Sequence, residues 1–530
     1  MAPAVPAEAQ ETAAATASAR LTRLTYDIDA KLDTTRHVLT GTERIHFTNT
    51  SPLPLPALYF HLYLNAFRDE RSVFMREGGG RLRQQPLGRP GGIEVERLVT
   101  GLGEDLSGGM EHELVPYDST QLRVNLPTPL PPGAALDLEL TFRAELPELV
   151  ARAGYAGEFY LLGQWFPKLA KLGSDGEFVS FPYHGFGEFF ADFADYTWSI
   201  ELPARFQVAS SGELVERSVQ GSVRRERYRR ARVHDVAWAA YPYFIQRSTQ
   251  VGKVRLDVYA PRGYEAALER QSRVLAAALP FFEAHYGAYP YSTLTAVLPT
   301  REARGAAGME YPTFFTSDGP WWALPAALPD PLQDVVSVHE LAHQWFAGII
   351  ASNEVAHPML DEGLAEWSAL DFLREYYVRE GSWTRRAPFP QGPFDVLRAA
   401  ALARMTGVPS SLLSADRYTD RTLAPAVYVR PALVLARIAE LHRHDVVQGA
   451  VGRYARKQRF RHPTPNELYA SFDHTLTHNY GHRVLRPSLA GEAQPALQLP
   501  DVTRQPSPSG WQYLPELWSL AFGLLRGLGP

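Results

Sequence analysis

Residues 334–346 read DVVSVHELAHQWF, and this stretch decides how the second half of the chain is interpreted. Its apolar residues recur every three or four positions, as they do on one face of an amphipathic helix. His339 and His343 are four residues apart, so a helix brings both imidazoles to one face, a single turn apart. Two imidazoles in that position can bind one metal ion. The stretch therefore predicts a helix that carries a metal site.

The metal expected at this pair is zinc, held by two histidines and one carboxylate, with the fourth position left for water. Zinc lowers the pKa of that water to about 7, and Glu340 is expected to take its proton and later pass it on. The third ligand is predicted to be Glu362, in the segment LDEGLAE (360–366) of a neighbouring helix. Cysteine ligands are excluded because the chain has no cysteine.

Eighteen residues separate His343 from Glu362, and with this spacing the chain resembles the M1 family of zinc metallopeptidases. That family's signature is HExxH, eighteen residues and then Glu, and the flanks HQWF (343–346) and DEGLA (361–365) are similar too. The resemblance implies a multidomain α+β fold. An N-terminal antiparallel β-sandwich-like domain is expected, followed by a thermolysin-like, mostly helical catalytic domain with a small sheet.

The segment AGMEY (307–311) resembles the Gly-Ala-Met-Glu-Asn strand with which that family binds its substrate. The resemblance implies that Gly308, Met309 and Glu310 bind the substrate, with the Glu310 carboxylate on the free α-ammonium. A buried cation needs a carboxylate partner, and a blocked N-terminus would leave Glu310 unpaired. The departures from the family's strand affect the shape of the first side-chain pocket more than the ammonium contact.

Two further segments resemble the family. VYVRPA (427–432) is similar to its Tyr-x-Lys-Gly-Ala segment, which implies that the Tyr428 hydroxyl donates to the oxyanion as water attacks the scissile carbonyl. Arg430 and Pro431 depart from that pattern at the predicted start of the next helix.

QWFP (164–167) resembles part of the family's β domain, where a Gln or Glu helps to bind the substrate amine. The resemblance implies that role for Gln164. Glu366, one turn after Glu362, either orients a zinc ligand or is a solvated helix residue.

The periodicity of the chain changes at about residue 248. Before it, strict alternation of apolar and polar residues predicts strands at 122–126, 136–142 and 196–202. After it, apolar residues at three-to-four spacing predict helices at 265–285, 334–346, 362–377 and 432–442, with a strand at 294–298. The expected divisions are a disordered leader (1–19), an N-terminal β domain (20–247), a catalytic domain (248–490), and a linker with a short helical tail (491–530).

Composition and charge exclude several other classes of protein. With 53 basic and 58 acidic residues the net charge is −5, which gives no general attraction to nucleic acid or to an anionic membrane. The arginine-rich stretch 224–232 is therefore interpreted as an exposed hairpin strand. The most apolar stretch, Leu517–Leu525, is too short to span a bilayer. The N-terminus lacks the basic start and apolar run of a secretory signal, which favours a cytoplasmic protein over an exported one whose signal has been removed.

The function predicted from these features is a zinc-dependent aminopeptidase with one zinc per chain. It is expected to remove residues from peptides with a free N-terminus by attack of a metal-activated water. Three alternatives stay open: a zinc endopeptidase in which Glu310 is structural, a non-catalytic scaffold of the same fold, and an accessory role at a membrane through the tail. Only about 40 residues follow residue 490, so we expect the large C-terminal helical domain of the family to be missing and the site to be more open.

Overall fold

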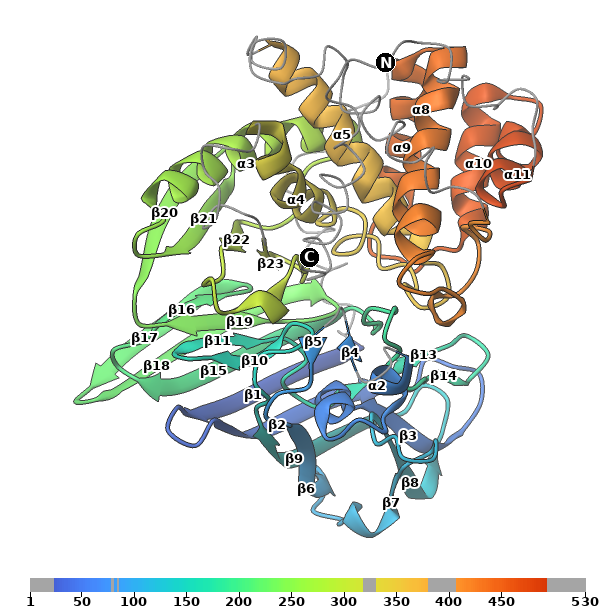
Figure 1. The fold of residues 1–530 in the computed structure, drawn as a ribbon. Coiled ribbons are helices and arrows are strands. Elements are labelled where there is room, and N and C mark those ends of the chain that lie inside the picture. Colours follow the sequence, from blue (N-terminus) through green and yellow to red (C-terminus); the bar gives the residue numbers. More distant parts are fainter. Residues whose placement is uncertain (1–22, 78–80, 83–84, 318–329, 380–406, 493–530) are drawn as a thin grey trace, which may run out of the picture.

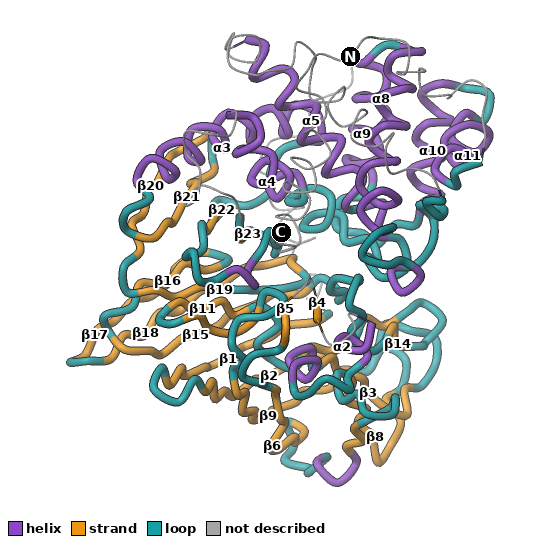
Figure 2. The backbone as a smooth tube through the Cα atoms, in the orientation of Figure 1, coloured by secondary structure: helices purple, strands orange, loops and turns teal. Residues whose placement is uncertain are grey.

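The computed structural model describes residues 23–77, 81–82, 85–317, 330–379 and 407–492 (Figure 1). The predicted leader (1–19) and nearly all of the predicted tail (491–530) lie outside the described residues. Strands fill the first half of the chain, whereas the second half is mostly helical and has one small sheet (Figure 2). This arrangement confirms the predicted α+β fold class. None of the helices in the described residues is long and apolar enough to cross a membrane.

A seven-stranded sheet forms the base of the first half, in the order β17-β18-β15-β1-β2-β9-β6. Along β1 and β9 buried residues alternate with partly exposed ones, as the period of two in the sequence predicts for a sheet with one face covered. The exposed arginines of the stretch 224–232 lie on β18, where Arg225 and Arg227 pair with Asp29 and Asp27. The strands are β1 (Leu24–Asp33), β2 (Val38–Thr48), β6 (Gly92–Thr100), β9 (Ala135–Glu145), β15 (Ala194–Pro203), β17 (Glu213–Gln220) and β18 (Val223–Val233).

Two four-stranded sheets complete the layers of this half, and aromatic side chains fill the core between the sheets. The Tyr26 ring of β1 stacks on Tyr196 of β15 with centroids 4.6 Å apart, and the edge of Phe166 approaches Tyr26 at 5.9 Å. The segment 164–167 is thereby fixed against the large sheet. The first small sheet contains β10 (Ala153–Ala156), β11 (Phe159–Leu162), β16 (Gln207–Ser210) and β19 (Trp238–Tyr241), and the second contains β3 (Leu55–His61), β7 (Met110–His112), β8 (Gln121–Leu130) and β12 (Lys168–Leu169).

The helical half is built on the sheet β20-β21-β22-β23, which α3 covers (Figure 1). The domain boundary expected at residue 247 falls inside β20, the first strand of this sheet. The predicted helix 334–346 starts earlier, at Asp330, and ends at Ala342, after which turns continue to Phe346. The elements are β20 (Phe244–Val251), β21 (Val254–Pro261), β22 (Thr293–Val297), β23 (Phe314–Thr316), α3 (Glu265–Tyr286), α4 (Asp330–Ala342), α5 (Glu362–Arg379), α8 (Arg430–His442), α9 (His444–Lys457), α10 (Pro465–Leu476) and α11 (Arg486–Leu489).

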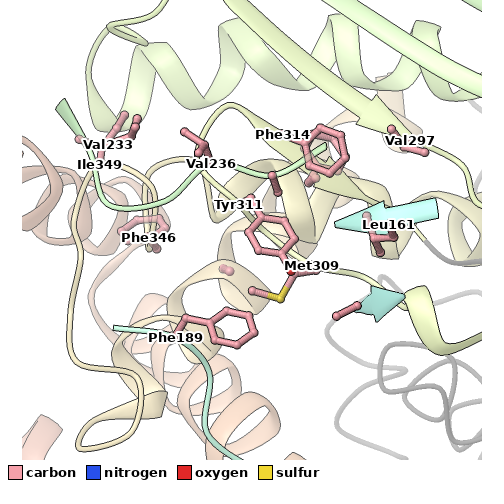
Figure 3. Close-up of a cluster of buried hydrophobic side chains, with 14 of the residues drawn as sticks. Leu161, Phe189, Val233, Val236, Val297, Met309, Tyr311, Phe314, Phe346 and Ile349 are labelled. Atoms are coloured by element: carbon pink, nitrogen blue, oxygen red, sulfur yellow. The ribbon is translucent and has the colours of Figure 1, made fainter. Parts of the chain in front are cut away.

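An apolar cluster joins the two halves (Figure 3). Phe189 of the first half stacks on Tyr311 of the second, with ring centroids 6.2 Å apart, and Met309 lies in the same cluster. A Cβ atom on Gly163 would lie only 1.7 Å from the Tyr311 hydroxyl oxygen, so a glycine is required where the first half meets this residue. The segment that carries Met309 and Tyr311 is therefore packed directly against the β domain.

The packing of the large sheet gives a first testable prediction. Gly41 on β2 faces Phe142 on β9, and a Cβ atom at Gly41 would lie 2.4 Å from the ring. Because the ring must then move within a packed core, we expect Gly41→Ala to lower the free energy of unfolding by about 1–3 kcal/mol in urea denaturation. The control is Gly449→Ala in α9, where a Cβ atom meets nothing within 4 Å and the helix gains up to about 1 kcal/mol. Equal effects of the two substitutions would contradict this packing.

Candidate metal centre

Three buried side chains converge where α4 ends and α5 begins. The Nε2 atoms of His339 and His343 are 2.9 Å apart. Glu362 Oε2 lies 3.1 Å from the first of these nitrogens and 3.2 Å from the second. All three side chains are buried. We call this arrangement the ligand triangle, and it brings together the three residues that the sequence predicts as zinc ligands.

The ligand triangle has the size that a zinc ion requires. Nitrogen and oxygen ligands bind zinc at about 2.0–2.1 Å, which separates the ligand atoms of a tetrahedral site by about 3.3 Å. The three sides of the triangle, 2.9, 3.1 and 3.2 Å, are close to that value. Burial opposes ionisation of Glu362, but hydrogen bonds from His339 and His343 outweigh it and hold the pKa of this carboxyl well below its usual range. The carboxylate is thus available as an anionic ligand.

Local sequence explains why these residues meet. The backbone N–H of His343 donates to the His339 carbonyl over 3.2 Å, which keeps the second histidine one turn after the first although α4 has ended. Glu362 is the first residue of α5, and Gly363 follows it. A Cβ atom on Gly363 would lie 2.6 Å from Pro431 Cβ, so the glycine allows α8 to pack against the first turn of α5. Pro431 departs from the family pattern and is the residue that makes this contact.

Each histidine of the ligand triangle also has a carboxylate at its other ring nitrogen. His343 Nδ1 hydrogen-bonds to Asp361, and His339 Nδ1 lies 3.2 Å from Glu366 Oε2. Such carboxylates fix the tautomer and orientation of a metal-binding imidazole. Glu366 is fully buried, so the interpretation as a solvated helix residue is wrong. Sequence reasoning missed Asp361, although its position directly before Glu362 was a signal.

Glu340 lies beside the strand that resembles the family's substrate strand. A Cβ atom on Gly308 would lie 2.0 Å from Glu340 Oε1, so the glycine allows the backbone to approach this carboxyl. The second oxygen, Oε2, is buried and has no hydrogen-bond partner among the described residues. Burial raises the pKa of Glu340 to about 7. A carboxyl with that pKa can both accept and return a proton near neutral pH.

The structure also brings Glu310 to the ligand triangle. Met309 forms a bridge to Thr316 of β23, with N–H···O distances of 3.3 and 3.0 Å, and this pairing fixes the backbone on which Glu310 follows. Glu310, His343 and Asp361 each offer one atom to a group in which all atoms lie within 4.8 Å of one another. Glu310 Oε1 is buried and has no hydrogen-bond partner in the part of the chain that the structure describes.

Tyr428, which follows the three predicted ligands in the sequence, also contacts the ligand triangle. It lies on the π-helix η7 (Ala424–Val429), directly before α8. Its hydroxyl donates to Glu362 Oε1, and its ring stacks on His339 with centroids 5.8 Å apart. The hydroxyl of Tyr428 is therefore a proton donor next to a predicted zinc ligand.

The side chain of Gln164 hydrogen-bonds to residues of the β domain rather than to the ligand triangle. Its side-chain amide donates to Asp235, and its carbonyl oxygen accepts from Lys168 Nζ over 2.8 Å. Lys168 and Asp235 themselves form a buried ion pair at 2.6 Å. Both ends of the Gln164 amide are thus engaged inside the β domain, and a role in amine binding would require one of these bonds to break.

Two residues that the sequence did not single out support the segment that carries Glu310. Arg152 Nη1 bonds both carboxylate oxygens of Glu188 at 2.6 Å, and Arg152 Nε donates to the Gly308 carbonyl over 3.3 Å. Arg152 and Glu188 both come from the β domain and both are buried. Nothing in the local sequence distinguishes them from surface charges, because their partners are distant in the chain.

Comparisons with known proteins agree with this architecture. The crystal structure of an M1 zinc metallopeptidase from Deinococcus radiodurans has a TM-score of 0.60 at 18% identity, and the match covers 92% of this chain and 97% of that one. A mutant of the Deinococcus enzyme bound to a Tyr-Ser-Ala substrate also has a TM-score of 0.60, at 19% identity, covering 90% of this chain and 96% of that one. This chain therefore has the fold of the M1 zinc metallopeptidases.

A curated relative is aminopeptidase M1-B of Oryza sativa subsp. japonica. It is 22% identical over 284 residues, which are 52% of this chain and 32% of the relative. The matched part is thus about a third of the length of that relative. No protein-family model matches the sequence.

The contact between Asp361 and His343 predicts a measurable effect on zinc affinity. Asp361→Asn keeps the shape of the side chain but removes the charge behind the imidazole, and such changes weaken metal binding by about 10–100-fold. Competition with a chromogenic chelator measures this directly, without reference to activity. Asp420→Asn, at an exposed position, is the control and should leave the affinity unchanged. An unchanged zinc affinity in Asp361→Asn would contradict the role of this contact.

Proposed function

We propose that this chain is a zinc-dependent aminopeptidase that removes N-terminal residues from peptides. The observation that carries the proposal is a buried, unpartnered carboxylate, Glu310, next to a triangle of two histidines and one glutamate. The triangle fits zinc, and the extra carboxylate fits the α-ammonium of a peptide. The fold shared with M1 zinc metallopeptidases supports the same conclusion.

In this proposal His339, His343 and Glu362 hold the zinc ion. When bound, zinc supplies a water of lowered pKa and polarises the scissile carbonyl. Glu340 accepts the proton of that water and delivers it to the leaving amine. The raised pKa of Glu340, about 7 as a result of burial, supports both halves of this task.

Tyr428 is proposed to stabilise the negative charge that develops on the carbonyl oxygen. Its hydroxyl, already beside Glu362, is a donor in a buried site, where such a hydrogen bond contributes more than it does in water. Glu310 is proposed to hold the substrate's α-ammonium, with Gly308 and Met309 as the backbone along which the peptide lies. These contacts would set the cleavage point one residue from the free N-terminus.

The proton-transfer role of Glu340 predicts a separation of metal binding from turnover. Glu340→Gln removes the base but leaves all three ligands, so we expect one zinc per chain and a fall of about 10²–10⁴-fold in kcat. His343→Ala removes a ligand and should lose both the metal and the activity. Elemental analysis and peptide hydrolysis measure the two properties on the same samples. A near-normal rate in Glu340→Gln would overturn the assignment of the base.

The role of Glu310 predicts discrimination between free and blocked peptides. A peptide and its N-acetylated form, digested with and without a chelator and followed by mass spectrometry, should give trimming of the free form alone. In Glu310→Gln the pairing of carboxylate and ammonium is lost, and we expect kcat/KM for the free peptide to fall at least about tenfold. Internal cleavage of the acetylated peptide would favour the endopeptidase alternative. Bound zinc without any cleavage would favour the non-catalytic scaffold.

A further inference from the structure

Four buried carboxyl groups interact with one another near the ligand triangle, and two of them, Glu310 and Asp361, each have an oxygen within 4.8 Å of a ring nitrogen of His343. They are Glu188, Glu310, Glu354 and Asp361, and we call them the acidic cluster. Their residues are 8%, 5%, 6% and 0% exposed, so each is more than nine-tenths buried. Glu354 interacts electrostatically with the other three and with His343. The proposed reaction assigns no role to Glu354.

Both halves of the chain contribute to the acidic cluster. The loop that carries Glu354 packs against the β domain at Gly187, where a Cβ atom would lie 3.0 Å from Val355 Cγ2. Glu188, the next residue, is neutralised by its ion pair with Arg152. Three of the four carboxyls, Glu310, Glu354 and Asp361, keep a buried oxygen without a hydrogen-bond partner among the described residues. Of these, only Asp361 has its other oxygen bonded within the described part of the chain, to His343.

The charges around Glu310 and Glu354 do not balance. Glu188 pairs with Arg152, and Asp361 pairs with His343. Glu310 and Glu354 have no such ion pair among the described residues, and each keeps a buried oxygen without a hydrogen-bond partner. The α-ammonium of a substrate can pair with one carboxylate. A second positive charge is needed for the other, because an unpaired charge in a buried site is unfavourable.

We propose that Glu354 determines specificity by binding the positively charged side chain of an N-terminal lysine or arginine. Glu310 binds the α-ammonium of the same residue, so two carboxylates pair with the two positive charges that only a basic N-terminal residue carries. This inference rests on the proposed aminopeptidase function. When the N-terminal residue of the substrate has a neutral side chain, Glu354 stays buried and unpaired. The free-energy cost of this unpaired carboxylate disfavours neutral substrates.

The first test compares basic N-terminal residues with neutral ones of similar shape. The substrates are aminomethylcoumarin derivatives of arginine and citrulline, and of lysine and norleucine. We expect the wild-type protein to prefer each basic residue at least about tenfold in kcat/KM. In Glu354→Gln this preference should disappear because kcat/KM falls for the two basic substrates. For the two neutral substrates kcat/KM should change less than about threefold.

The matched control is Glu43→Gln, which alters another buried glutamate whose oxygens have no hydrogen-bond partner among the described residues but which lies on β2 of the sandwich. This variant should keep the wild-type preference. The inference is overturned if the wild-type protein shows no preference for basic residues. It is also overturned if Glu354→Gln lowers kcat/KM equally for all four substrates, which is the result expected of a purely structural residue.

A second test does not depend on turnover. Zinc-loaded Glu340→Gln protein, and its double variant with Glu354→Gln, are titrated with arginine amide and with citrulline amide in a calorimeter. Arginine amide should bind at least about tenfold more tightly than citrulline amide, and only when Glu354 is present. This result, combined with no cleavage of any substrate by the wild-type protein, would reject the proposed function but keep the cation site.

Equal binding of the two amides would overturn the inference. The same holds if the protein carries a second divalent ion per chain that is lost in Glu354→Gln, since the acidic cluster would then be a metal site.

Discussion

The structure depends on one electrostatic constraint: three side-chain atoms, from the end of α4, the turn that follows it and the start of α5, lie within 3.2 Å of one another in a buried site. Two imidazoles and a carboxylate at this separation form a set of ligands that fits a single zinc ion. The free energy of binding a metal at such a site also contributes to folding. In the proposed function, the ion that the chemistry requires would also hold the end of α4 and the start of α5 together.

The surroundings of the ligand triangle follow from this constraint. Asp361 and Glu366 lie behind the two imidazoles and orient them, and Gly308 and Gly363 let backbone approach closely where any side chain would collide. Glu340 lies against the substrate-like strand, within the same buried region. Residues from α4, α5 and η7 thus surround one candidate zinc site, and the β domain supports the segment 307–311 that faces them.

Much of this was predictable from sequence because its signals are local. The spacing of His339, His343 and Glu362 depends only on helical geometry and on one connecting segment, so the sequence alone predicts that the three side chains meet. Alternation in 136–142 and three-to-four spacing in 362–377 likewise depend on neighbours in the chain, and they predicted β9 and α5. Gly308 and Gly363 are visible in the sequence, but the sequence does not show why glycine is needed there. The cause is a close contact with a residue distant in the chain, Glu340 for Gly308 and Pro431 for Gly363.

The unpredicted parts depend on distant contacts. Arg152 donates to the carbonyl of Gly308, 156 residues away. A local sequence pattern does not predict a contact between residues so far apart in the chain. Glu354 lies in a loop with no periodicity, and its burial depends on the meeting of the two domains. Gln164 shows the opposite case, since a loose local resemblance gave it a role while its amide is engaged by Lys168 and Asp235.

X-ray absorption at the zinc edge is the measurement that tests the central claim most directly. The purified chain should contain one zinc ion with four nitrogen or oxygen neighbours at about 2.0–2.1 Å, including the multiple-scattering signature of two imidazoles. A protein with no stoichiometric zinc, or a zinc ion with fewer than two imidazole ligands, would contradict the account.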